Sequence, residues 1–464
     1  MANAADSVEL AAVSFAITTT MECDLELDAA RKGWLISATF IGMMAGGWLW
    51  GQWADKYGRK RTLVIALALN ASAALGCALA ASFLELVMYR VICGIGIGGS
   101  IPILFSFFSE FTPAAQRGKA VTVLAASWMV GAIIVAVFAF LIISPTECAR
   151  DSSDKRTQAA ICADQATQRC GLTVVGGHDF DSWRIFLLVC TVPAILACVL
   201  VAFRQESPRW LMENGFPEEA EAVLAHLARA NGTENSGWAV ALHSATNDES
   251  QTDDMPGSVE RKQRTFMDAL RDLSTPPLWS RMVLLCGCWF FLSFGFYGFT
   301  LWLPTYYKSG GIDDDSDVYL VSIYVGLSNL PGNLFSYLMV DRIGRKWTLI
   351  LSLILSGAAV FVVLVITSTE GVVAFSCVFA AVSVSAWNAL DVLVVELFPT
   401  VVRSTAFGIQ AAVGRMGSIM SSIIFGEFSD SNPAVPMTVT GVVLFAAALC
   451  CLALPNTGRG TAIH

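Results

Sequence analysis

Long apolar runs, separated by short charged stretches, dominate the chain. Most of these runs are close to the roughly 20 residues that a helix needs to cross the 30 Å hydrocarbon layer of a bilayer. We therefore predict membrane-spanning helices at residues 33–53, 62–83, 84–107, 119–143, 183–203, 282–303, 318–340, 347–367, 371–395, 403–427 and 434–455.

The opening stretch, from Met1 to about Thr20, is also apolar, but it contains Asp6 and Glu9 and has no charged flank before it. We interpret it as a first span whose beginning is missing, as in a truncated gene model. A secretory signal peptide is not expected, because a basic leader and a cleavage site are both missing. With this segment, the chain is predicted to be an all-α polytopic membrane protein of twelve helices.

Composition agrees with a membrane environment. Of the 464 residues, 55% are hydrophobic and 14% are charged, whereas soluble domains are typically about 25% charged. Basic residues gather in the loops at 56–61, 117–119 and 342–346, which are therefore expected to face the cytosol. The net charge of −9 adds nothing about partners.

Two motifs each occur twice along the chain. Asp-Lys-Tyr-Gly-Arg-Lys at 55–60 recurs as Asp-Arg-Ile-Gly-Arg-Lys at 341–346. Glu-Phe-Thr-Pro-Ala-Ala-Gln-Arg at 110–117 recurs as Glu-Leu-Phe-Pro-Thr-Val-Val-Arg at 396–403. Both offsets are 286 residues (341 minus 55, and 396 minus 110). This symmetry predicts two six-helix halves in parallel orientation, residues 1–203 and 282–464, joined by a cytosolic linker at 204–281.

The repeated motifs have the chemistry of a latch at the cytosolic mouth. Glycine permits a tight reversal between two spans, and the carboxylates can pair with the basic residues. The alternative is that the basic residues serve only as positive-inside anchors, which the duplication disfavours. The candidate gate residues are Asp55, Gly58, Arg59, Glu110, Arg117, Asp341, Gly344, Arg345, Glu396 and Arg403.

The first motif pair resembles the signature loop of the major facilitator superfamily, and Glu-Ser-Pro-Arg-Trp-Leu at 206–211 is similar to the sugar-porter branch. The segments at 90–111 and 385–399 resemble the synaptic vesicle glycoprotein 2 family. The resemblance implies a twelve-helix major facilitator fold. Vertebrate members of that family insert a large glycosylated domain between the seventh and eighth spans, where this chain has a short acidic loop, so functions of that domain are not expected.

Ionisable side chains at membrane depth are the first functional candidates, because an unpaired charge there costs at least a few kcal/mol. Asp6, Glu9, Asp391 and Arg415 are predicted to serve ion coupling or, alternatively, to form a structural ion pair. Helix spacing suggests that Asp6 and Glu9 face a cavity, and that Arg415 pairs with Asp391 or, alternatively, with Asp6 or Glu9. Arg90 is expected to reach the far interface.

Aromatic residues are the second candidates. Trp128 and Trp387 each lie nine residues from the cytosolic end of a span, in opposite halves, which places both about 13 Å deep by helix rise. They are predicted to line a central cavity, as the matching pair does in the family that the chain resembles. Asn388 and Asp391 join them as candidate substrate-binding residues. Packing alone is the alternative role.

Other patterns do not suggest chemistry. The glycines at 94, 96, 98 and 99 lack the spacing of a nucleotide loop and favour close helix packing. The 13 cysteines have no metal-ligand spacing, and the 4 histidines fall outside the predicted spans, so neither a metal site nor a cofactor is expected. Disulfides on the non-cytosolic side, with open connectivity, could involve Cys23, Cys148, Cys162 and Cys170.

Together these features predict a secondary transporter and not an enzyme, with a small polar or organic-ion solute and membrane lipid as partners and no nucleic acid. The substrate, the coupling ion, the oligomeric state and any protein partner are left open. The protein is expected to be a multi-pass membrane protein of a synaptic or other intracellular vesicle membrane or of the plasma membrane. The alternative is a transporter-like vesicle protein with a regulatory or structural role and little transport.

Overall fold

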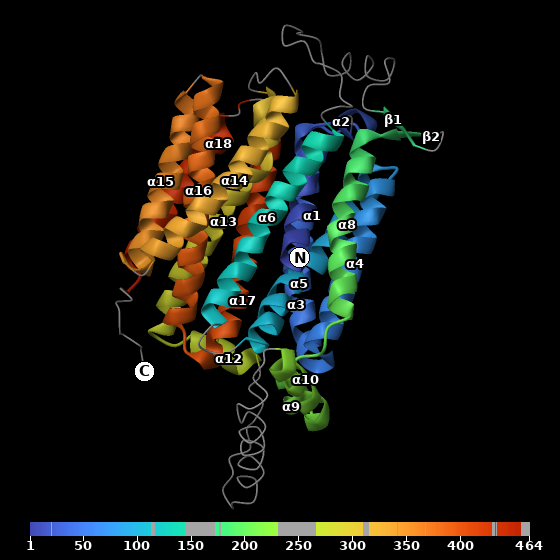
Figure 1. Cartoon of the computed structure of the whole chain (residues 1–464). Coiled ribbons are helices and arrows are strands. Elements are labelled where there is room, and N and C mark those ends of the chain that lie inside the picture. Colours follow the sequence, from blue (N-terminus) through green and yellow to red (C-terminus); the bar gives the residue numbers. More distant parts are fainter. Residues whose placement is uncertain are drawn as a thin grey trace, which may run out of the picture.

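The computed structural model describes residues 1–19, 21–112, 117–143, 172–175, 178–230, 266–309, 315–340, 342–366, 368–428, 432 and 434–455. Within this part of the chain, twelve helices form one bundle of two halves (Figure 1). The first half contains α1 (Ala2–Ala16), α3 (Ala29–Tyr57), α4 (Arg59–Leu79), α5 (Phe83–Glu110), α6 (Arg117–Ile142) and α8 (Ser182–Ala202). The second contains α13 (Leu278–Ser309), α14 (Asp315–Met339), α15 (Arg345–Val365), α16 (Thr369–Leu397), α17 (Thr400–Phe428) and α18 (Ala434–Leu452).

Every predicted span corresponds to one of these helices, and the predicted fold class is confirmed. By length and composition, eight helices of the described chain could cross a membrane: α4, α5, α6, α8, α13, α15, α16 and α18. The remaining four are α1, which is 15 residues long, and α3, α14 and α17. Of these, α3 packs along α17, and α14 along α6, so one face of each helix contacts the opposite half, where small and polar residues are tolerated.

Shorter elements cover the two ends of the bundle. At the outer end lie α2 (Met21–Asp24) and an antiparallel hairpin of β1 (Leu172–Val175) and β2 (His178–Asp181), in which Leu172 faces Asp181. At the opposite end, which the basic loops predict to be cytosolic, lie α9 (Pro208–Glu213), α10 (Pro217–Ala230) and α12 (Phe266–Leu273). The predicted linker is therefore partly helical, and α13 begins inside its expected range (Figure 1).

Local sequence signals explain several helix ends. Asp28 caps α3 by accepting a hydrogen bond from the Arg31 backbone N–H at 2.7 Å, and Ser82 caps α5 in the same way. Gly58 and Gly344 occupy equivalent turns of the two halves with φ of 104° and 95°. A side chain is disfavoured in this backbone region, which is why the repeated motif contains glycine.

The glycine-rich run of α5 packs tightly, as expected. A Cβ atom added at Gly94 would collide with the backbone of α3 at Thr39 and Gly42, and one added at Gly98 would collide with Met43. Small residues therefore let α3 and α5 approach closely, as in other membrane helix pairs.

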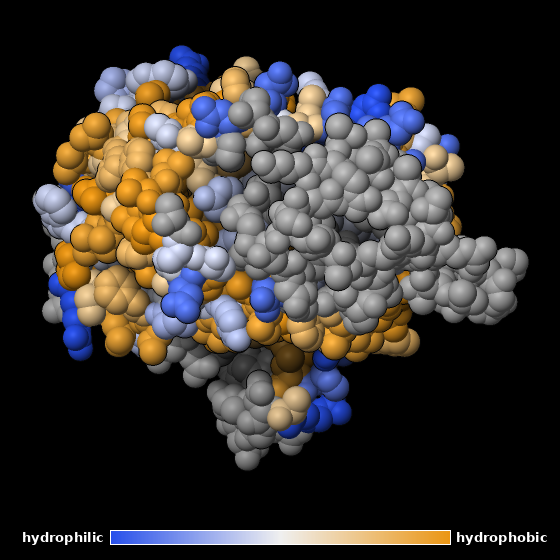
Figure 2. All heavy atoms as spheres, turned by 90° about the horizontal axis from the view of Figure 1, so that it is seen from above, coloured by the Kyte–Doolittle hydropathy of each residue, from blue (hydrophilic) through white to orange (hydrophobic). Residues whose placement is uncertain are grey.

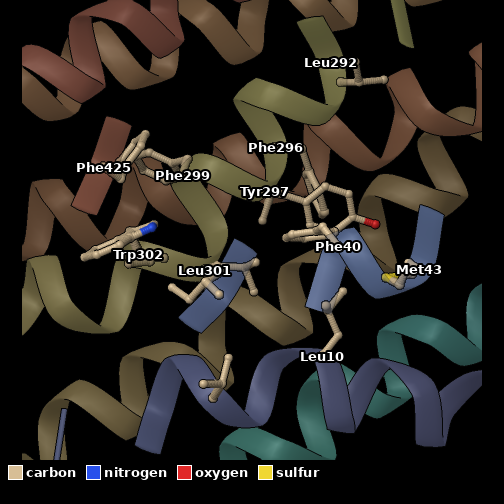
Figure 3. Packing of buried hydrophobic residues seen from close by; sticks show 14 of the residues in the cluster. Leu10, Phe40, Met43, Leu292, Phe296, Tyr297, Phe299, Leu301, Trp302 and Phe425 are labelled. Atoms are coloured by element: carbon tan, nitrogen blue, oxygen red, sulfur yellow. The ribbon is translucent and has the colours of Figure 1, made fainter. Parts of the chain in front are cut away.

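The buried core is continuous across the two halves. Leu10 and Phe40 from the first half lie close to Phe296, Tyr297 and Leu301 of α13 in the central cluster (Figure 3). Seen from the outer end, hydrophobic residues cover much of the flank and rim of the bundle (Figure 2). This distribution is that of a bundle whose lateral surface meets lipid.

Candidate functional site

A cavity of about 90 Å³ lies between the two halves. Its walls come from α1 and α6 on one side and from α13, α14 and α16 on the other. None of the described residues that line it carries a formal charge. Its polar atoms come from the hydroxyl, amide and indole groups of Ser7, Ser14, Trp128, Tyr297, Thr300, Ser322 and Asn329.

The two candidate tryptophans relate differently to this cavity. Trp128 lines it directly. Trp387 lies one layer behind, with its ring centroid 6.0 Å from that of Phe296 and 6.2 Å from that of Tyr297, both of which line the cavity. Trp387 also packs edge-on against Trp289 at 5.2 Å. The indole N–H groups of Trp387 and Trp289 are buried and have no hydrogen-bond partner among the described residues.

The two polar residues near Trp387 on α16, Asn388 and Asp391, differ in their hydrogen bonding. The Asn388 amide donates to Asn333 Oδ1 at 2.9 Å, which ties α16 to α14. Asp391 is half-buried, and no hydrogen bond or ion pair links it to another described residue. Its carboxylate therefore keeps its acceptor capacity, one helical turn from Trp387.

The expected ion pair between Arg415 and Asp391 is not present. Arg415 Nη1 instead donates to the Tyr297 hydroxyl at 3.3 Å, and the guanidinium carbon lies 5.7 Å from the centre of the Tyr297 ring. The spacing along α17 predicts a depth for Arg415 but not the direction in which its side chain points around the helix. Tyr297 was missed, although a tyrosine inside the apolar run 282–303 was the available signal.

The carboxylates of α1 point away from the cavity, which corrects the expected direction. Ser7 and Ser14 line the cavity, whereas Asp6 accepts a hydrogen bond from Ser100 of α5 at 2.5 Å inside the first half. Asn70 of α4 donates to the other Asp6 oxygen at 3.4 Å. Asp6 is therefore part of the packing between α1, α4 and α5.

Arg90 does not reach the far interface, so that expectation was also wrong. Its side chain is 1% exposed, and Nη1 lies 4.0 Å from Glu9 Oε2 and 3.1 Å from the Glu9 carbonyl oxygen, to which it donates. The opposite charge of Glu9 and the packing of α1 against α5 retain the guanidinium inside the bundle. Counting residues along α5 could not reveal this partner on another helix.

The first cytosolic motif forms a compact network. Arg59 lies 3.0 Å from Asp55 and 3.5 Å from Glu110, both as ion pairs. The linker reinforces this network, because Glu206 accepts a hydrogen bond from the Lys60 backbone N–H at 2.8 Å. Trp210 of α9 donates its indole N–H to the Asp55 carbonyl at 3.0 Å.

The second motif forms an equivalent contact. Arg345 donates to Glu396 at 2.9 Å, and Arg403 donates to the Phe398 carbonyl at 3.3 Å. Asp341 and the side chain of Arg117 lie outside the described residues, as do Cys148, Cys162, Cys170 and the side chain of Cys23. The described ion pairs of Arg59 with Asp55 and Glu110 and of Arg345 with Glu396 each lie within one half.

The halves touch at the outer ends of α3 and α17. Ser37 Oγ donates to the Ile419 carbonyl at 3.3 Å. A Cβ atom at Gly33 would lie 2.7 Å from the Ser422 carbonyl oxygen and 3.0 Å from Gly426 Cα. The two backbones are therefore in direct contact here, and this end of the interface is closed.

The same helix faces are uncovered toward the cytosol. Trp48 follows Ser37 by eleven residues, which is three helical turns, and is 70% exposed. Gly408 precedes Ile419 by eleven residues, and added Cβ atoms at Gly408 and Gly51 would meet nothing within 4 Å. The two helix faces are therefore in contact at one end and uncovered toward the other, which we interpret as an inward-open arrangement between α3 and α17.

Comparison with known proteins agrees with this architecture. The chain matches the family described as sugar (and other) transporter over residues 6–462. Synaptic vesicle glycoprotein 2B of Rattus norvegicus is 28% identical over 98% of this chain and 82% of its own length. Synaptic vesicle glycoprotein 2C of Homo sapiens is 26% identical over 98% of this chain and 77% of its own length.

Solved structures show the same fold. The partially occluded inward-open xylose transporter from E. coli aligns with a TM-score of 0.75 and 20% identity, covering 100% of this chain and 97% of that chain. A bacterial homologue of the human lysosomal transporter Spinster aligns with a TM-score of 0.65 and 13% identity, covering 97% and 94%. The matching family is one of transporters. The chain belongs to the sugar (and other) transporter family of the major facilitator superfamily and is a multi-pass membrane secondary transporter.

Proposed function

We propose that the cavity between α1, α6, α13 and α14 binds one small polar solute, which crosses the membrane as the two halves alternate in access. The observation that carries this proposal is the position of the cavity between halves that touch at their outer ends and diverge toward the cytosol. Trp128 forms one wall, and Trp387 supports the opposite wall through Phe296 and Tyr297. Asn388 positions α16 through its hydrogen bond to Asn333. The Asp391 carboxylate is proposed to accept a hydrogen bond from the solute when the two halves separate at the cytosolic end.

The solute is proposed to be uncharged when it lies in this cavity. The lining combines hydroxyl and amide groups with apolar and aromatic surfaces and contributes no formal charge. Such a surface suits a solute with hydrogen-bonding groups on one edge and an apolar face. D-Xylose is the first probe, because a D-xylose-proton symporter is among the structures with this fold.

The paired motifs at the cytosolic end are proposed to act as gates. The Arg59 network and the Arg345–Glu396 pair each brace one half, so that each half moves as a rigid unit. We propose that Arg117 takes part in the Arg59 network and that Asp341 takes part in the Arg345–Glu396 contact.

The intramembrane charges are proposed to couple transport to an ion, with the proton as the simplest candidate. Asp6 and Glu9 are buried carboxylates that can each carry or release a proton, and Arg90 compensates Glu9. Arg415 and Asp391 are proposed to change partners during the cycle, since Arg415 is bonded to Tyr297 in the inward-open state.

Flux measurements test these proposals. Purified protein in liposomes is expected to accumulate labelled D-xylose under a pH gradient and to exchange it without one. Asp6→Asn and Glu9→Gln are expected to lose accumulation and keep exchange, while the exposed Glu370→Gln on α16 keeps both. Absence of flux and of thermal stabilisation for D-xylose and a panel of small polar solutes would contradict transport and favour a regulatory or structural role.

A further inference from the structure

The first half contains a buried polar layer that is separate from the cavity. It is formed by Glu9 of α1, Asn70 of α4 and Arg90 of α5, each at most 1% exposed. Asp6 adjoins the layer through its hydrogen bond from Asn70. The cavity lies on the other face of α1, at Ser7, Leu10, Ala11 and Ser14.

Four atoms of this layer have no hydrogen-bond partner among the described residues. Two are donors, Arg90 Nε and Nη2, and two are acceptors, Glu9 Oε1 and Asn70 Oδ1. Leaving one such buried atom unsatisfied costs about 1–3 kcal/mol, and more for a charged group. Since donors and acceptors occur together in one layer, a partner that both donates and accepts would satisfy both kinds.

The separation of the charged groups gives independent evidence. Arg90 Nη1 and Glu9 Oε2 lie 4.0 Å apart, which is beyond the range of a direct N–H···O hydrogen bond. A gap of this size between charged groups commonly contains a bridging water. We propose that the layer binds ordered water, which bridges Arg90 to Glu9 and donates to Asn70 Oδ1 inside the first half.

The second half lacks an equivalent layer at the corresponding positions. With the 286-residue offset, Asn70 corresponds to Ser356 and Arg90 to Ser376. Ser356 shares a hydrogen bond with Ser383 at 3.0 Å, and Ser376 donates to the Val372 carbonyl at 2.8 Å. These hydroxyl groups are satisfied within the protein, so the water site belongs to one half only.

Hydroxyl-radical footprinting of the full-length protein in liposomes tests the proposal. An X-ray pulse splits bound water in place and modifies neighbouring side chains, even those that bulk solvent does not reach. Cys93 reports on the layer, because its thiol donates to the Asn70 carbonyl at 3.8 Å and is fully buried. Cys451 and Cys288 are equally buried and lie against each other in the second half, which makes them matched controls.

We expect Cys93 to be modified several-fold faster than Cys451 and Cys288, as measured by mass spectrometry of the peptides. Asn70→Leu should reduce the rate at Cys93 and leave that at Cys451 unchanged, whereas Ser356→Ala should affect neither. Equal rates at all three cysteines would overturn the proposal. So would a melting temperature that rises with sodium chloride and not with choline chloride, since that result indicates a bound cation in place of water.

Discussion

Tyr297 of α13 contacts three side chains: Phe40, Trp387 and Arg415. The sequence did not predict that these side chains lie together. Its ring packs edge-on against Phe40 of the opposite half at 5.0 Å. It lies 6.2 Å from Trp387, and its hydroxyl accepts the hydrogen bond from Arg415. Because Tyr297 also lines the cavity, it connects the cavity wall to the Arg415 guanidinium.

We expect Tyr297→Phe to destabilise the protein by about 1.5–3 kcal/mol, the usual range for a hydrogen bond to a charged group. The substitution removes only the oxygen that accepts from Arg415 and keeps the ring contacts. Thermal unfolding in detergent measures the effect. Tyr324→Phe on α14 is the control, because Tyr324 is 49% exposed. Equal melting temperatures for the two variants would show that the Arg415 bond contributes nothing.

We expect Trp128→Ala and Trp387→Ala each to weaken D-xylose binding by about 1–3 kcal/mol, through loss of aromatic contact area and of cavity shape. Isothermal titration in detergent gives the affinity. Trp34→Ala, at an exposed position of α3, should bind as the unmodified protein does. Wild-type affinity in both cavity variants would place the site elsewhere.

Helix rise predicts a depth for Trp128, Arg415 and Asp391 but not the direction in which each side chain points. It could not show that Arg415 meets a tyrosine, nor that Arg90 turns inward to Glu9. Those facts depend on how helices from distant parts of the chain are rotated against one another.

At the scale of elements, hydropathy predicted the helices well because the bilayer fixes their length. The repeated motifs likewise marked the turns at Gly58 and Gly344. The short helices α9, α10 and α12 escaped prediction, although α10 carries the signals of an amphipathic helix: Pro217 at its start, Glu218 and Glu219 in its first turn, and Ala220 and Val223 on one buried face. Packing on the bundle supplies their stability: Trp210 and Leu211 of α9 are buried with Ala220 and Val223 of α10.

The outer end is held by a small cluster around α2. Trp183 of α8 donates its indole N–H to Asp24 at 2.6 Å, and Arg184 pairs with Asp181 at 3.1 Å. Burial raises the pKa of the Asp24 carboxyl; the hydrogen bond from Trp183 opposes this shift, and the neighbouring Asp181 adds to it. Folding therefore increases the affinity of the Asp24 carboxyl for a proton.

We expect this cluster to become more stable as the pH outside falls. A carboxyl whose pKa is raised by folding binds protons more tightly when folded, so its contribution to stability is lost as the pH rises through that pKa. Asp24→Asn should raise the melting temperature at neutral pH and flatten its dependence below neutrality, by about 1 kcal/mol or less at this partly solvated site. Glu26→Gln is the neighbouring control. An unchanged pH dependence in Asp24→Asn would exclude this role.

At the scale of the whole molecule, the two halves share a fold but carry different polar side chains at equivalent positions. The first half carries the buried charges Asp6, Glu9 and Arg90, and its cytosolic turn is tied to α9 through Glu206. The corresponding positions of Asn70 and Arg90 in the second half hold serines. The internal repeat therefore predicted the architecture and not this asymmetry, because equivalent backbone positions carry different side chains.

The closed outer contact gives the sharpest test of alternating access. A Cβ atom at Gly33 would meet backbone atoms of Ser422 and Gly426, which cannot rotate away, whereas one at Gly51 on the same helix would meet nothing within 4 Å. Gly33→Val should therefore force the outer ends of α3 and α17 apart and favour the outward-open state. Gly51→Val carries the same change in helix propensity without the collision.

The measurement uses Ser14→Cys as a reporter, because Ser14 lines the cavity. In sealed liposomes of known orientation, an impermeant maleimide added on the outer side is expected to label this cysteine faster in the Gly33→Val background than in the Gly51→Val background. Mass spectrometry separates this site from the native cysteines. Access from the cytosolic side should fall in parallel, because opening one end closes the other if the halves move as rigid bodies. Faster labelling from both sides would instead indicate a loosened bundle, and unchanged labelling would show that the Gly33 contact does not control access.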